Sequence, residues 1–181
     1  MAKLSAEYKE IIRSLPKAEL ELALLKLAEK RDNFDYLLVN VLDKESGESE
    51  LLERAKHEID ALRDKKYKGK STQHRLSKML VDCGKVITRF STNCKTKTLE
   101  VDLILYVLEK PYNENTKYLG SFHTTFDSKM ALLTKKLIGV IEKKLHEDYK
   151  MEYEDRVNAY LKILHQKSNH LNSVFNLPDK I

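Results

Sequence analysis

The chain has 181 residues and a formal net charge of +5; hydrophobic residues make up 41% and charged residues 34%, with only 5 Gly and 3 Pro. This length favours one domain, and the scarcity of Gly and Pro argues against collagen-like, low-complexity and turn-rich β architectures. Because no apolar run approaches the ~20 residues of a membrane span and the N-terminus lacks the apolar stretch of a secretory signal, we expect one cytoplasmic domain over residues 1–181.

The N-terminal quarter of the chain predicts three helices. Apolar residues at helical spacing indicate a short helix over about 5–14. Pro16 is expected to open a second helix, since its missing N–H is not needed in a first turn. The stretch Leu20–Ala28 is apolar over a broad face, as is typical of a helix that is buried on two sides. A third helix should reach Leu42 and lie against the second, because the break between them is short.

The middle of the chain predicts two longer helices. The first spans about 49–66, and Ser71 or Thr72 should cap the second, which reaches about residue 92. Cys83 lies on the apolar face of that second helix and is expected to be a buried structural thiol. Cys94 lies near a segment end, where we expect more exposure, and no pattern of His, Asn and Asp supports catalysis by its thiol.

The C-terminal half predicts three further helices. Residues 99–110 are apolar nearly all round, so a strand is the alternative, but the length and the helical flanks favour a buried helix that Pro111 ends. A long periodic stretch from about 117 to 149 and a last helix over about 152–168 follow. The tail from about residue 172 is expected to be frayed. The fold class is therefore all-α, with about eight helices in antiparallel hairpins, as a short α-solenoid or an irregular bundle.

Two segments show weak internal similarity. Leu20–Leu42 reads LELALLKLAEKRDNFDYLLVNVL, and residues 99–110, LEVDLILYVLEK, repeat its first eleven letters in part, with one residue inserted. In leucine and charge placement, residues 16–43 and 99–110 resemble a helical hairpin of HEAT or armadillo-type α-repeat proteins. That resemblance implies stacked helix pairs and a binding surface rather than chemistry, although the chain lacks a constant repeat period. The chain as a whole also resembles small helical bacterial proteins, which implies no particular function.

Motifs of catalysis and cofactor binding are missing from the sequence. It contains no GxGxxG, P-loop, GxSxG or HExxH motif and no Glu-x-x-His pair of a helical di-metal site. The best-spaced pair, Glu142 with His146, is more typical of a solvated helix face. We therefore expect no catalytic residue, no metal and no cofactor, and predict that the protein is not an enzyme.

The positive charge is concentrated in one segment. Residues 63–97 hold eleven cations and two anions, a local net charge of +9, whereas the rest of the chain carries −4. This segment could meet phosphates or an acidic protein surface. Alternatively it is a solvated face whose cations pair with acidic neighbours such as Glu50, Glu53, Glu58 or Asp60. The candidate anion- or partner-binding residues are Lys66, Lys68, Lys70, Arg75, Lys78, Lys85 and Arg89.

These observations favour a non-enzymatic helical binding or scaffold protein. Its partner would be another protein, which presents either an acidic surface or an amphipathic helix to the exposed helices. A homo-oligomer is compatible with the sequence, and a membrane partner is not expected. The alternative function is sequence-independent nucleic-acid binding through the basic segment 63–97, although only Tyr67 adds an aromatic ring to it.

Overall fold

The computed structural model describes residues 4–43, 45–122, 124–169 and 172–181, and within them it contains nine α-helices and no strand. This confirms the all-α prediction, including a helix rather than a strand at residues 99–110. The elements are α1 (Ala6–Ser14), α2 (Lys17–Ala28), α3 (Arg31–Leu37), the π-helical turn η1 (Leu38–Leu42), α4 (Gly47–Asp64), α5 (Thr72–Asn93), α6 (Lys97–Glu114), the 3₁₀ turn η2 (Thr116–Tyr118), α7 (Thr125–Lys144), α8 (Glu147–Lys167) and α9 (Asn172–Phe175).

The contacts within the chain divide it into two compact units, Met1–Gly47 and Glu48–Ile181. The sequence predicted one domain over residues 1–181, because no Gly- or Pro-rich linker interrupts the helical pattern. The boundary between the two units falls directly after Gly47, the first residue of α4, and the single domain stays a prediction. Composition therefore gave no signal for this boundary.

The N-terminal unit consists of short helices with few buried side chains. Ser5 caps α1 by accepting a hydrogen bond from the backbone N–H of Tyr8 (3.4 Å). Asp35, Leu38 and Val39 are buried, but α1 and α2 contain no buried residue. The expectation that α2 is buried on two sides is therefore wrong: four of its five leucines lie exposed, and Leu20 is only partly buried.

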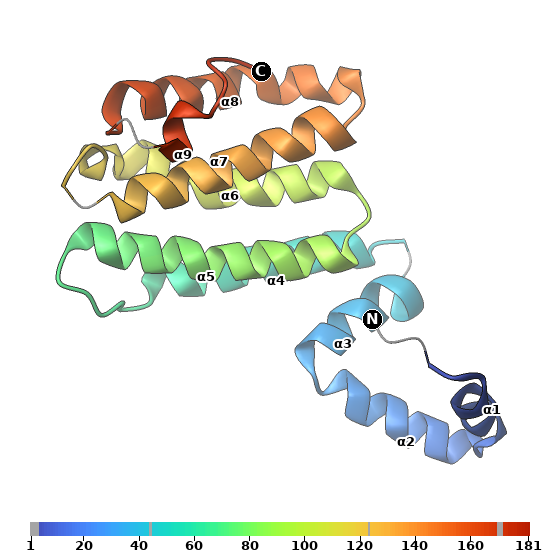
Figure 1. Ribbon diagram of the computed structural model, residues 1–181. Coiled ribbons are helices and arrows are strands. Elements are labelled where there is room, and N and C mark those ends of the chain that lie inside the picture. Colours follow the sequence, from blue (N-terminus) through green and yellow to red (C-terminus); the bar gives the residue numbers. More distant parts are fainter. Residues whose placement is uncertain (1–3, 44, 123, 170–171) are drawn as a thin grey trace. The chain divides into compact units, whose positions relative to one another are not determined.

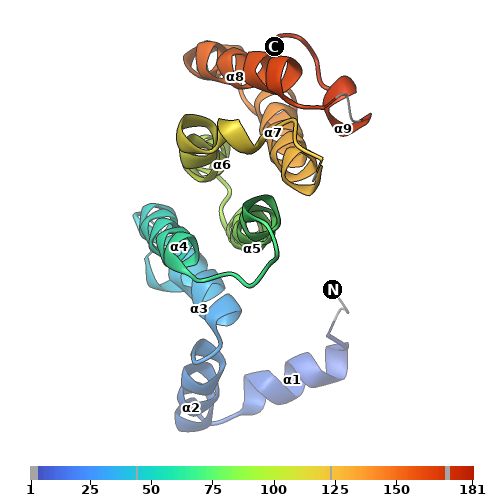
Figure 2. The same ribbon diagram turned by 90° about the vertical axis from the view of Figure 1, so that its left-hand side faces the viewer.

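Helices α4 to α8 of the C-terminal unit form a two-layered antiparallel stack. Consecutive helices run in opposite directions (Figure 1), and in the view along their axes α4, α6 and α8 form one layer while α5 and α7 form the other (Figure 2). Helix α6 packs against both α5 and α7, and α7 also contacts α5 and α8. The antiparallel hairpins predicted from the sequence are therefore present in this unit.

The core of the C-terminal unit is drawn from all five helices of the stack. Its apolar positions follow the three- and four-residue spacing of a helix that buries one face. The largest side chains that are almost wholly buried are Ile59, Leu80, Ile87, Phe90, Leu103, Ile104, Leu108, Phe126, Met130, Leu137, Ile141 and Leu161.

Two helix boundaries differ from the prediction. Pro111 does not end α6, which continues to Glu114. Because Pro111 lies in the last turn, its missing N–H costs the helix only one late hydrogen bond. The stretch 117–149 is not one helix either: α7 spans Thr125–Lys144, and α8 begins after His146, whose Nδ1 accepts a hydrogen bond from the N–H of Asp148 (3.5 Å).

The C-terminal tail is packed rather than frayed. Val174, in α9, and Leu177 are buried, and α9 contacts both α7 and α8. The N–H of Ile181 donates a hydrogen bond to Oδ1 of Asn158 on α8 (2.9 Å). Among residues 172–181, which the structure describes, the few apolar side chains are thus sufficient to hold the chain end against the stack.

Candidate binding surfaces

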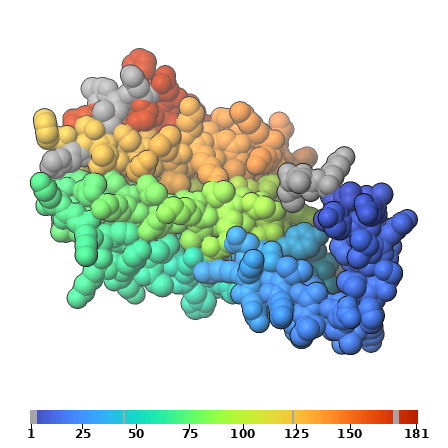
Figure 3. Space-filling model, turned by 60° about the horizontal axis from the view of Figure 1, so that its bottom comes forward, coloured from blue at the N-terminus to red at the C-terminus, as the bar shows by residue number. Residues whose placement is uncertain are grey.

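Exposed apolar side chains gather on the two N-terminal helices. Between 43% and 67% of each of six large apolar residues is exposed; Figure 3 draws the atoms of these helices in dark blue. Monomeric proteins rarely leave so many large apolar residues of one element uncovered unless they bind something there. We call this set the α1–α2 apolar surface; its members are Ile11 and Ile12 on α1 and Leu22, Leu24, Leu25 and Leu27 on α2.

The length of these helices makes the exposure significant. Helix α1 has nine residues and α2 has twelve. Isolated helices shorter than about 12–15 residues are marginally stable in water, and most helices in proteins gain their stability by packing an apolar face. Since neither helix contains a buried residue, both lack this contribution in the chain by itself.

We predict that the amides of α1 and α2 exchange with solvent roughly 100-fold faster than those of α6, because packing contributes little to the first two helices. Helix α6 is the internal control, since most of its apolar residues are fully buried. Hydrogen–deuterium exchange of the full chain, followed by mass spectrometry of its peptides, measures both rates in one sample. Equal protection of α2 and α6 would contradict the prediction.

Six of the seven predicted basic residues are exposed. Lys66, Lys68 and Lys70 are exposed on the connection between α4 and α5, and Arg75, Lys78 and Lys85 are exposed on α5. Arg89, also on α5, is partly buried and forms an ion pair with Glu58 of α4. The pairing with acidic neighbours that the sequence analysis left open is therefore realised at this position.

Asp82 neutralises the centre of the basic segment. Its Oδ1 lies 2.8 Å from Nζ of Lys85 and its Oδ2 lies 3.5 Å from Nζ of Lys65. The hydrogen bond from Lys85, the positive charges of both lysines and a further hydrogen bond from Tyr67 hold the pKa of this carboxyl below its usual value, against a smaller effect of burial. The charge of Lys85 is therefore balanced by Asp82, so Lys85 contributes less than an unpaired lysine to the positive charge of this segment.

Two other predicted cations, Lys78 and Arg75, form hydrogen bonds with the connection between α4 and α5 and with the first turn of α5. Nζ of Lys78 donates a hydrogen bond to the carbonyl oxygen of Lys68 (2.9 Å). The guanidinium of Arg75 donates to the carbonyl oxygen of Gly69 (3.5 Å) and to the hydroxyl of Thr72 (3.0 Å). The segment 65–71 is thereby held against the first turns of α5, which Ser71 caps as predicted.

A cavity of about 620 Å³ lies beside this segment, and we call it the Tyr67 cavity. Lysines line it from two sides: Lys65, Lys66, Lys68 and Lys78 come from the basic segment, and Lys129 comes from α7. Lys129 is not among the predicted basic residues, because only the packing of α7 on α5 brings it to this place. The remaining lining residues are Tyr67, His74, Ser77, Val81, Asp82 and Thr125.

Tyr67 is fixed at the edge of the cavity. Its hydroxyl donates a hydrogen bond to Oδ2 of Asp82 (3.2 Å). Burial, together with the negative charge of Asp82, raises the pKa of this phenol to about 12, so the hydroxyl stays protonated at neutral pH and remains a donor. Nζ of Lys65 lies 5.0 Å from the centre of the ring, within the range of a cation–π interaction.

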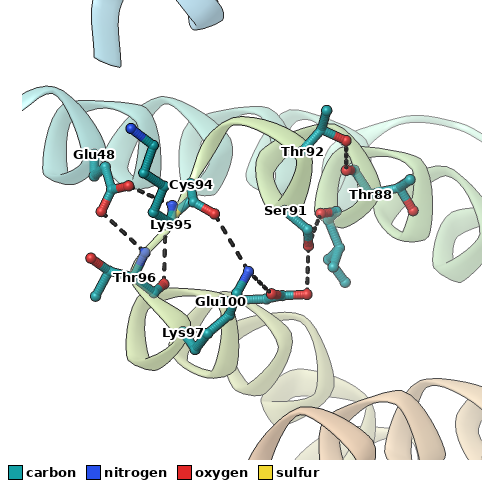
Figure 4. Close-up of polar contacts among 10 residues, drawn as sticks. Glu48, Thr88, Ser91, Thr92, Cys94, Lys95, Thr96, Lys97 and Glu100 are labelled. Carbon is teal, nitrogen blue, oxygen red and sulfur yellow. Dashed lines mark hydrogen bonds and ion pairs between the residues drawn. The ribbon is translucent and has the colours of Figure 1, made fainter. Parts of the chain in front are cut away.

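The polar cluster at the α5–α6 connection is structural (Figure 4). Glu48 accepts hydrogen bonds from the backbone N–H groups of Lys95 and Thr96 and thereby ties α4 to this connection. Cys94 is buried, contrary to the exposure expected for it, and burial raises the pKa of its thiol to about 12. A thiol in this state is a poor nucleophile at neutral pH. Cys83 is likewise buried, as predicted.

No family model, curated protein or solved structure matches the chain. None of the helices in the described part of the chain combines the length and the apolar character that crossing a bilayer requires. The described His, Cys, Asp and Glu residues form no group of three or more that could hold a metal ion.

Proposed function

We propose that the chain is a non-enzymatic helical binding protein whose N-terminal unit docks an amphipathic helix of a partner protein. The observation that carries the proposal is the α1–α2 apolar surface, in which six large side chains lie exposed on two helices without a buried residue. A partner that covers these side chains would supply the packing that both helices lack. The resemblance to HEAT and armadillo-type hairpins and the stacked antiparallel helices of the C-terminal unit support the same function.

The energetic gain from covering this surface would be large enough for specific binding. Burying a whole leucine side chain contributes roughly 1.5–3 kcal/mol, so covering the exposed parts of four leucines would contribute several kcal/mol before the entropic cost of association. Residues 1–47 carry eight cations and nine anions, and the unit is therefore nearly neutral. Apolar contact, rather than charge attraction, would dominate the binding.

A site-specific photo-crosslinker tests the proposal. Placed at Leu25, it should yield a protein adduct of defined mass in native lysate. Placed at Lys162, an exposed position on α8 outside this surface, it should yield little of that adduct. The captured protein is then purified and titrated with the chain. Replacing Leu22 and Leu25 together by Glu should weaken the complex at least about tenfold, because the apolar contact is lost.

The control for this titration is Lys162→Glu, a charge reversal at an exposed position on α8, which should change the affinity by less than about twofold, since it removes no apolar contact. Crosslinking of equal strength at Leu25 and Lys162 would contradict the proposal. An adduct with the mass of two copies of the chain would show that a second copy of the chain, and not a different protein, covers this surface.

Nucleic-acid binding through residues 63–97 is less favoured. Such binding depends on cations that are available to neutralise phosphates. Within the described part of this segment, Arg89 is paired with Glu58, and both Lys85 and Lys65 lie against Asp82. These pairs reduce the charge that α5 offers to an extended polyanion.

A further inference from the structure

We propose that the Tyr67 cavity binds a small phosphorylated ligand, with the phosphate between Lys66, Lys68 and Lys129 and an apolar body against Tyr67 and Val81. This site is independent of the α1–α2 apolar surface. It lies wholly within the C-terminal unit, and its ligand belongs to a different chemical class from the partner proposed above.

The first argument is an excess of positive charge around one concave space. Five lysines line the cavity, and Asp82 is the only acidic residue among its described lining residues. Asp82 is already balanced by Lys65 and by Lys85, which lies outside the cavity. Lys66, Lys68, Lys78 and Lys129 make no ion pair with any described residue. Four ammonium groups around one cleft produce a positive potential that an anion would relieve.

The second argument is that the cavity is held in shape before any ligand enters. The hydrogen bond from Lys78 to the carbonyl of Lys68 and that from Tyr67 to Asp82 connect the segment 65–71 to α5 at two points. Arg75 adds a third point through the carbonyl of Gly69. Such fixing lowers the entropic cost of binding, because the segment is already ordered.

The third argument concerns the size and chemistry of the ligand. A volume of about 620 Å³ falls within the ~300–1,000 Å³ that is common for small-molecule sites. Lysine is a frequent phosphate ligand because its ammonium acts as a compact charge with three donors. Val81 is 40% exposed although it is apolar, and Tyr67 also lines the wall of the cavity. These two side chains suit an aromatic or aliphatic body attached to the phosphate.

Calorimetric titration of the full chain with ADP as the probe tests the site. We expect one ADP per chain, weaker binding of inorganic pyrophosphate, and no measurable binding of adenosine. The variant in which both Lys66 and Lys129 are replaced by Gln should bind ADP at least about tenfold more weakly, since two charge-assisted contacts are lost. Val81→Ala should weaken binding of ADP but not of pyrophosphate, since only ADP carries a ring system that can contact this part of the wall.

The matched control is Lys70→Gln, a charge removed from the same connection at an exposed position that does not line the cavity. It should change the affinity for ADP by less than about twofold. An equal loss in Lys70→Gln and in the double variant would overturn the proposal, because it would indicate general attraction of anions to the segment. Absence of ADP binding to the wild-type chain, or adenosine binding as tightly as ADP, would also overturn it. Far-UV circular dichroism of each variant establishes that it remains folded.

Discussion

Replacing Phe126 by Ala should lower the free energy of unfolding of the C-terminal unit by about 3–5 kcal/mol. Phe126 lies in the first turn of α7 and is 0% exposed. Its removal takes a whole ring out of the interior and leaves a cavity that the surrounding helices can fill only in part. The loss therefore combines the transfer of the ring from water with missing dispersion contacts.

Phe122→Ala is the matched control, because the same substitution is made four residues earlier at a side chain that is 94% exposed. It should change stability by less than about 0.5 kcal/mol. Urea unfolding followed by circular dichroism at 222 nm, for the wild-type chain and both variants, measures the difference. Equal effects of the two substitutions would show that the packing of α7 differs from that described here.

The second large effect is expected at Glu100, where Glu100→Gln should cost about 2–3 kcal/mol at neutral pH. The side chain is almost wholly buried; Oε1 accepts a hydrogen bond from the hydroxyl of Ser91 (2.7 Å) and Oε2 one from Nζ of Lys97 (2.9 Å). Burial alone would raise the pKa of this carboxyl. The two hydrogen bonds and the charges of Lys97 and Lys144 outweigh burial, and the pKa lies below its ordinary value of 4.5.

The lowered pKa also predicts how stability depends on pH. A carboxyl whose pKa is lower in the folded state binds its proton more tightly when the chain is unfolded, so acid favours unfolding. The stabilisation by Glu100 is complete above about pH 4.5 and is lost as the pH falls through the lower folded value. Glu100→Gln should therefore unfold with a flatter dependence on pH below 4.5 than the wild-type chain. Urea titrations at several pH values measure the free energy of unfolding of the wild-type chain, of Glu100→Gln and of the exposed control Glu114→Gln. The prediction would be contradicted if Glu100→Gln lost stability in acid as steeply as the wild-type chain.

The helices of the C-terminal unit could be predicted from the sequence because each has an apolar face of its own. The face of α5 is continuous from Leu76 to Phe90, and Ser71 marks its start by the ordinary capping pattern. Residues 99–110 were the difficult segment, since a helix that is buried all round shows no periodicity. The length of the segment correctly indicated a helix.

The exposure of α2 could not be predicted, because apolar character indicates that a face should be covered without identifying what covers it. The break between α7 and α8 after Lys144 could not be predicted either, because apolar residues continue at helical spacing across it. Only some of the lysines that line the Tyr67 cavity could be predicted from the sequence. Lys66, Lys68 and Lys78 were identified by local charge, whereas Lys129 lies on α7, outside the basic segment 63–97, and reaches the cavity through tertiary packing.

The position of α7 determines how cooperatively the C-terminal unit unfolds. This helix contacts α5, α6, α8 and α9. In a linear array each repeat touches only its neighbours, so the ends can unravel while the middle persists. Here α7 contacts four other helices, and its release would remove part of the packing surface of all four at once. The unit should therefore melt in a single all-or-none step, without a partly unwound species that accumulates and exposes its core to aggregation.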